Sequence, residues 1–156
     1  SGVHMEIQHD LLLRPLGEWK ETVVSRDLEQ SIYVITLYPN MPDAFFNADY
    51  SAAKAVILET FGSGNSMLRA SIRDFLKRAS AQGLPVINVS QCLGGAVEMG
   101  RYAASNVLLE GGVINGYDMT LEAALAKAHY LAALGTPYEV FKKSFSDSLC
   151  GEISVK

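Results

Sequence analysis

The sequence has little of what marks the specialised classes of protein. It holds 2 cysteines and 3 histidines in 156 residues, and Cys92 and Cys150 are too far apart to act as a metal-ligand pair. Spacing alone leaves a disulfide between them open, but a chain of this length does not need one, and reduced thiols are expected. These scarcities exclude a disulfide-rich scaffold and predict that no metal is bound.

Long apolar runs and concentrated positive charge are also missing. No apolar run approaches the roughly 20 residues needed to span a bilayer, and the N-terminus lacks the layout of a signal peptide. Lys and Arg number 13 against 17 Asp and Glu, for a net charge of −4, and the basic residues are scattered. A nucleic-acid-binding module needs a concentrated basic surface. The sequence therefore predicts no membrane span, no nucleic-acid partner and a cytoplasmic location.

What remains is the composition of an ordinary globular domain. Hydrophobic residues make up 49% and charged residues 19%, and the length fits one domain with its own core. Residues 1–30 are charge-rich and irregular, and we interpret them as an interdomain connector, or a foreign remnant, that could add one edge strand. The regular part, 31–156, is the predicted domain. Because the chain opens with Ser-Gly rather than Met, we expect a processed chain or a piece of a longer protein.

Strand and helix patterns alternate through the predicted domain. Short β-branched or apolar runs predict strands at 32–38, 55–58 and 85–90. Helices are predicted at 41–53, 66–82, 102–110, 121–134 and 137–149, with Gly83 as the stop after the second and Thr120 as the cap of the fourth. Strands alternating with helices through short links imply parallel pairing by right-handed crossovers. The expected fold is α/β, a small three-layer sandwich with a mainly parallel sheet.

Two glycine-bearing loops follow the second and third predicted strands, at 61–65 and 90–95. In an open parallel sheet, ligands bind beyond the carboxyl ends of the strands. Ser63 and Asn65 would offer a hydroxyl and an amide there, and a helix starting near Ser66 would offer free N–H groups to an anion. The plainer alternative is a pair of tight strand-to-helix turns. The glycine spacing matches neither a dinucleotide fingerprint nor a P-loop, so no cofactor is predicted.

No group of residues in the sequence combines a nucleophile with the base that would activate it. A nucleophilic Cys92 would need a neighbouring base, and His129 lies within an alanine-rich helix pattern that suits a packed residue. His4 and His9 fall in the predicted connector without metal-ligand partners. We therefore predict no catalytic residue in this chain.

Four motifs stand in collinear order along the predicted domain. They are Ala55-Val-Ile-Leu-Glu-Thr-Phe-Gly-Ser-Gly-Asn65, Val89-Ser-Gln-Cys-Leu-Gly-Gly-Ala-Val97, Gly112-Val-Ile-Asn-Gly-Tyr-Asp-Met-Thr-Leu-Glu-Ala-Ala-Leu-Ala-Lys127 and Leu149-Cys-Gly-Glu-Ile153. Together they resemble the C-terminal domain of type I, cytoplasmic L-asparaginases. The resemblance covers about Ile32 to Ile153, and four ordered motifs are far more specific than one. In the closing motif Cys150 stands where the family has arginine.

The resemblance implies a part of an amidohydrolase that converts L-asparagine to L-aspartate and ammonia. The family's nucleophilic threonines lie in an N-terminal domain whose motifs are not found here, so this chain alone is expected to be inactive. Its partners would be that N-terminal domain and further copies in a homo-oligomer. The active site of the family lies between neighbouring subunits, which makes Asn65, with Ser63, the expected substrate contact in trans.

The resemblance also implies a regulatory asparagine site at Ser90-Gln91-Cys92, with Ser90 and Cys92 as candidate effector contacts. Glu59 occupies the position of a regulatory arginine of some allosteric members. An anion in place of a cation reverses the field that would hold a ligand carboxylate. Two alternatives stay open: a stand-alone amino-acid-binding module using the same loops, and the asparaginase-like subunit of a tRNA-dependent amidotransferase.

Overall fold

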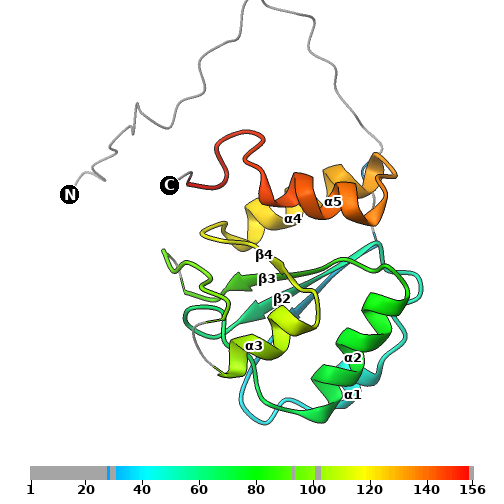
Figure 1. Ribbon diagram of the computed structural model, residues 1–156, viewed down its shortest axis with the longest axis vertical. Coiled ribbons are helices and arrows are strands. Elements are labelled where there is room, and N and C mark those ends of the chain that lie inside the picture. Colours follow the sequence, from blue (N-terminus) through cyan, green and yellow to red (C-terminus); the bar gives the residue numbers. More distant parts are fainter. Residues whose placement is uncertain (1–27, 29–30, 93, 101–102, 155–156) are drawn as a thin grey trace, which may run out of the picture.

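The computed structural model describes residues 28, 31–92, 94–100 and 103–154, and in this part strands and helices alternate (Figure 1). Of the predicted connector, 1–30, only Leu28 is described, so that prediction lies outside the described residues. The elements in chain order are β1 (Ile32–Thr36), α1 (Ala44–Asn47), β2 (Ala55–Thr60), α2 (Ala70–Ala81), β3 (Val86–Ser90), α3 (Ala103–Glu110), β4 (Ile114–Asn115), α4 (Leu121–Ala133) and α5 (Tyr138–Ser146).

The four strands form one parallel sheet in the order β1-β2-β3-β4. Every residue of β3 is buried, and so is every residue of β2 except Glu59, which is half-buried. Strands buried on both faces carry continuous apolar runs, which is the pattern that predicted them. Because all four strands run parallel, their carboxyl ends lie along one edge of the sheet, here called the rim.

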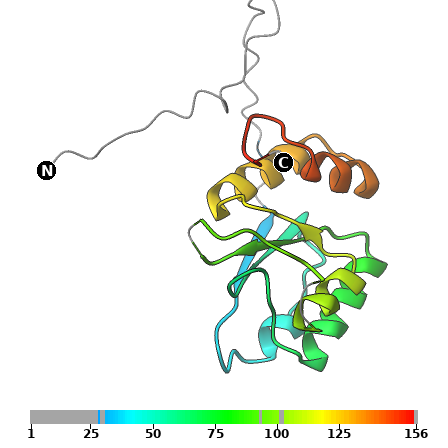
Figure 2. The same cartoon turned by 60° about the vertical axis from the view of Figure 1, so that its left-hand side comes forward.

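Two hydrophobic cores lie on opposite faces of the sheet, which makes three layers (Figures 1 and 2). Helices α1, α2 and α3 cover one face, where Phe46 and Phe75 pack against alternate residues of β1 and β2. Helices α4 and α5 cover the other, where Phe141 and Phe145 stack with ring centroids 5.8 Å apart. The predicted α/β fold with a parallel sheet is therefore confirmed.

Three predicted helices are shorter than their sequence patterns, and the one expected at 137–149 occupies Tyr138–Ser146. The helix expected at 41–53 is confined to Ala44–Asn47, and the one expected from Ser66 begins only at Ala70. Arg69 has an extended backbone (φ −122°, ψ 147°), and its guanidinium donates to the carbonyl oxygen of Met41. That contact anchors the segment before α2. The expectation that helical N–H groups near Ser66 face the 61–65 loop was therefore wrong.

Two helix boundaries depend on local chemistry, and both lie at the residues that the sequence predicts. The Thr120 hydroxyl accepts from the Ala123 N–H at 3.3 Å and caps α4, and Gly83 follows α2 with φ +63°. Within the described part of the chain, no helix has the length and apolar character that a bilayer crossing requires.

Candidate functional site at the rim

The two loops predicted to share the rim are adjacent. Strands β2 and β3 pair directly, with Thr60 in register with Ser90 at their carboxyl ends. The first loop closes tightly on itself: the Phe61 N–H donates to the Asn65 carbonyl at 2.9 Å, and the Asn65 N–H donates to the Phe61 carbonyl at 2.8 Å. The two turns thus leave the same edge of the sheet side by side.

A buried amide on β3 supports the first loop from below. Asn88 is fully buried; its Oδ1 accepts from the Thr60 hydroxyl at 2.6 Å, and its Nδ2 donates to the Gly64 carbonyl at 3.1 Å. Gly64 has φ +94°, and a Cβ there would lie 2.7 Å from Val97 Cγ1. This position therefore requires glycine for both its conformation and its space.

Ser90 joins the two loops. Its hydroxyl donates to the Gly62 carbonyl at 2.5 Å and accepts from the Cys92 N–H at 2.9 Å. Next to it, the Gln91 amide donates to the carbonyls of Leu37 at 2.7 Å and Glu59 at 2.9 Å. These hydrogen bonds hold the carboxyl ends of β1, β2 and β3 against one another. In this structure the hydroxyl of Ser90, a predicted effector contact, links the two loops by hydrogen bonds.

Asn65 is half-buried, and its Oδ1 is buried with no hydrogen-bond partner among the described residues. An unpaired buried acceptor costs about 1–3 kcal/mol of desolvation, so native proteins rarely leave one without a purpose. Its neighbour Ser63 is also half-buried, and the Ser63 carbonyl accepts from the Glu98 N–H at 2.9 Å. The amide at position 65 is therefore neither sealed inside nor fully satisfied.

A small acidic cavity of about 100 Å³ lies beside the second loop. Ser90 and Cys92 line it together with the carboxylates of Glu59, Asp118 and Glu122, and no Lys or Arg occurs among the described residues that line it. Glu59 Oε2 accepts from the Thr36 hydroxyl at 2.6 Å, and Asp118 accepts from the Ser154 N–H at 3.0 Å. Three acidic residues and no basic one in this described lining favour an ammonium group over a carboxylate.

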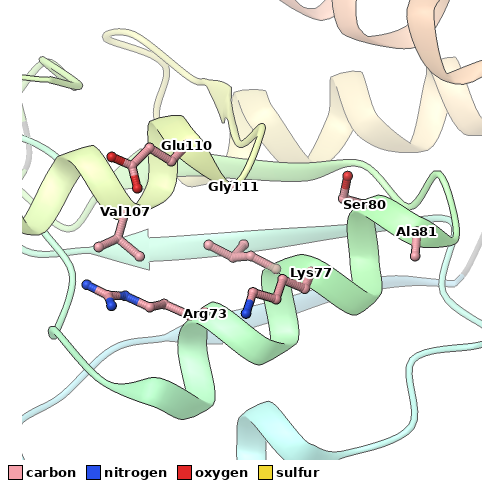
Figure 3. A pocket seen from close by; sticks show the side chains of 8 residues that line it. Arg73, Lys77, Ser80, Ala81, Val107, Glu110 and Gly111 are labelled. Atoms are coloured by element: carbon pink, nitrogen blue, oxygen red, sulfur yellow. The ribbon is translucent and has the colours of Figure 1, made fainter.

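Larger hollows lie elsewhere. One of about 590 Å³ runs between α2 and α3, where Figure 3 shows Arg73 and Lys77 extending from α2 and Val107 pointing from α3. It contains none of the predicted site residues. Another, of about 540 Å³, borders the rim next to Val97 and Tyr117. Neither of these two hollows is lined by Ser63 or Asn65.

Another polar contact fastens the C-terminal loop. Lys127 Nζ lies 2.5 Å from Glu152 Oε1, donates to the Asp147 carbonyl at 2.6 Å and sits 5.2 Å from the Phe145 ring centroid. The side chains of Lys127 and Glu152 are 4% and 8% exposed. Burial alone would raise the pKa of Glu152, but bonds from Lys127 Nζ and the N–H groups of Cys150 and Leu149 outweigh it and hold that pKa well below 4.5.

Sequence reasoning missed these supporting residues, although signals existed. Asn88 is the one amide in an otherwise apolar strand, and Lys127 stands among alanines and leucine on the buried face of α4. A polar side chain at such a position needs a buried partner. The short strand β4 and the left-handed backbone of Tyr117 (φ +53°) gave no such signal.

The fold and the rim motifs agree with the family comparison. The chain belongs to the Glutaminase/Asparaginase C-terminal domain family, whose model matches residues 31–145. L-asparaginase 1 of Escherichia coli K12 is 40% identical over 141 residues, which cover 90% of this chain and 41% of that protein. The crystal structure of L-asparaginase I from Vibrio cholerae superposes with a TM-score of 0.74 at 43% identity, over 81% of this chain and 39% of that one.

Some relatives carry other names. The human 60 kDa lysophospholipase is 37% identical, over 98% of this chain and 27% of its own length. A component of the glutamyl-tRNA(Gln) amidotransferase of Aeropyrum pernix is 28% identical, over 84% of this chain and 30% of its own. The chain thus spans less than half of each of these relatives.

Proposed function

We propose that this chain supplies the C-terminal half of the active site of an L-asparagine amidohydrolase. Asn65, assisted by Ser63, would bind the substrate from across a subunit boundary, while the nucleophile belongs to an N-terminal domain. The observation that carries the proposal is the unsatisfied Oδ1 of Asn65, held at the rim by the Asn88 and Ser90 contacts. With Oδ1 turned inward, Nδ2 is left to donate to a substrate carboxylate.

The rim offers a surface on which a further domain, of the kind that the relatives carry, would lie. The hollow of about 540 Å³ borders the loop around Val97 and carries the exposed ring of Tyr117. A domain of the size that the relatives possess in addition would cover this edge and exclude water from Asn65. Exclusion of water strengthens each hydrogen bond to the substrate.

The test supplies the missing part in trans. The chain alone should release no ammonia from L-asparagine, and addition of the N-terminal segment of the Escherichia coli relative should restore release. Asn65→Ala should then lower the restored rate by about 10²-fold, the size expected for one lost donor at the transition state. Asn47→Ala, an exposed amide on α1, is the matched control. If Asn65→Ala leaves the restored rate unchanged, Asn65 is not part of the substrate site.

Regulation at Ser90 and Cys92 stays a separate prediction. The acidic lining of the adjacent cavity suits an ammonium group and repels a carboxylate, so asparagine should bind there weakly. Calorimetric titration of the chain with L-asparagine measures this directly. Tight binding by the chain alone would instead favour a stand-alone amino-acid sensor.

The amidotransferase alternative rests on the 28% identity to the Aeropyrum pernix relative. It needs a tRNA-facing surface on other polypeptide, because the net charge here is −4. A cytoplasmic location and a homo-oligomer, both implied by the family resemblance, complete the proposal.

A further inference from the structure

The hollow of about 590 Å³ between α2 and α3, here called the α2–α3 groove, has an apolar floor. Leu76 and Val107 are buried and form this floor, and Gly111, directly after α3, borders it. A Cβ on Gly111 would lie 2.6 Å from Leu76 Cδ1, so glycine leaves this part of the groove without a side chain of its own. The volume lies within the roughly 300–1,000 Å³ that small-molecule sites occupy.

Two cations on α2 line this groove, and the fold makes little use of either. Arg73 and Lys77 stand one helical turn apart, and both extend from α2 (Figure 3). Within the described part of the chain, the Arg73 guanidinium has no hydrogen bond or ion pair, and Lys77 Nζ has only the Asp74 carboxylate at 3.9 Å. Because like charges four residues apart slightly destabilise a helix, this pair brings the fold no evident gain.

The other two cations of the same segment are bound by the fold. Arg69 donates to the Met41 carbonyl, and Arg78 donates to the Phe46 carbonyl. Both contacts tie the α1 segment to α2. Of the four cations within 69–78, two therefore hold α1, and the two that line the groove remain available to a ligand.

We propose that the α2–α3 groove binds a small organic anion with an apolar body. Arg73 and Lys77 hold its carboxylate, sulfonate or phosphate head, since a guanidinium matches such groups with paired N–H donors. The body lies on Leu76 and Val107, where it is removed from water together with the floor. Glu110, on the α3 side of the groove, repels a second anionic group, which favours a ligand that is charged at one end.

The proposal does not rest on the amidohydrolase assignment. The groove lies on the face of the sheet that α1, α2 and α3 cover, and none of the predicted rim residues lines it. The net charge of the chain is −4, so its overall field repels anions. A preference for an anionic ligand must therefore come from a local concentration of positive charge.

A matched pair of fluorescent probes tests the charge and the apolar body separately. Anilinonaphthalene sulfonate is an anion, and phenylnaphthylamine has the same aromatic body without the sulfonate. In titrations of the full 156-residue chain, the anion should bind about tenfold more tightly, the size expected for a charge-assisted hydrogen bond. Arg73→Gln with Lys77→Gln should remove this preference, and Lys142→Gln with Lys143→Gln, exposed on α5, should keep it. An anion that binds no better than the neutral probe, or a preference that survives Arg73→Gln with Lys77→Gln, overturns the proposal.

NMR chemical-shift mapping locates the anionic probe without any substitution. The backbone amides of Val107 and Gly111 should shift as anilinonaphthalene sulfonate is added to the native chain. Those of Ala128 and Phe141, in the core on the opposite face of the sheet, should not. Absence of shifts at Val107 and Gly111, with or without shifts at the rim loops, would place the probe elsewhere and contradict the proposal.

Discussion

The rim loops and the C-terminal loop are both held by buried polar side chains. The two regions differ in whether all of their buried polar groups have hydrogen-bond partners. At the C-terminus, Lys127 and Glu152 satisfy each other and the surrounding backbone completely. At the rim, Asn88 and Ser90 fasten the loops with neutral hydrogen bonds and leave Asn65 Oδ1 unpaired. The difference separates a buried contact whose polar groups are paired from a loop that retains an unpaired acceptor, the observation on which the proposed role of Asn65 rests.

Removing one member of the ion pair should have the largest effect on stability. Lys127→Met leaves Glu152 buried without its cation, and breaking a buried pair in this way costs about 3–5 kcal/mol. Urea denaturation measures the free energy of unfolding. Lys77→Met is the matched control, because Lys77 is 80% exposed and its 3.9 Å contact with Asp74 contributes little. Equal losses in the two variants would contradict the role assigned to the buried pair.

The same ion pair should make the free energy of unfolding fall at acid pH. Because the pKa of Glu152 is lower in the folded state than its ordinary 4.5, its contribution is present above that value and is lost as the pH falls below it. Urea midpoints measured between about pH 7 and pH 3 should fall steeply for the native chain and less steeply for Glu152→Gln. Parallel curves would show that other carboxylates control acid unfolding.

Asn88→Ala should cost less than the ion pair, about 2 kcal/mol, because it leaves neutral groups unpaired at Thr60 and Gly64. Asn106→Ala, an exposed amide on α3, should change the free energy of unfolding by less than about 0.5 kcal/mol. Hydrogen exchange at the 61–65 amides would show whether the loss is local to the rim.

The smallest effect should come from Asn65 and should have the opposite sign. Asn65→Leu removes an unpaired buried acceptor, so the free energy of unfolding of the chain should stay unchanged or rise by up to about 1 kcal/mol. The same variant should lose most of the ammonia release restored in trans. A clear destabilisation by Asn65→Leu would show that the amide is structural and would remove the contrast between the two regions.

The periodic parts of the fold could be predicted from the sequence. The apolar runs of β2 and β3 and the amphipathic pattern of α2 gave the elements, and Thr120 gave a cap at the right residue. The start of α2 could not be predicted, because it depends on the long-range bond from Arg69 to Met41. A two-residue strand such as β4 carries no period at all.

The candidate site, like the fold, could be predicted only in part from the sequence. Glycine-bearing loops after adjacent strands predicted that Ser63 and Ser90 would lie near one another, since topology brings carboxyl ends together. Whether a hydroxyl points to a ligand or to a neighbouring carbonyl is decided by local packing, and Ser90 turned out to bind the Gly62 carbonyl. The proposed partner of Asn65 lies outside this chain, so no reasoning within it could supply that contact.

The brevity of β4 makes one border of the sheet a poor template for another strand. With only Ile114 and Asn115 paired to β3, that border offers few backbone groups for a ladder with a second polypeptide. A fibre grows only when strands can be added at both borders of a sheet. The short strand thus discourages open-ended polymerisation through this border.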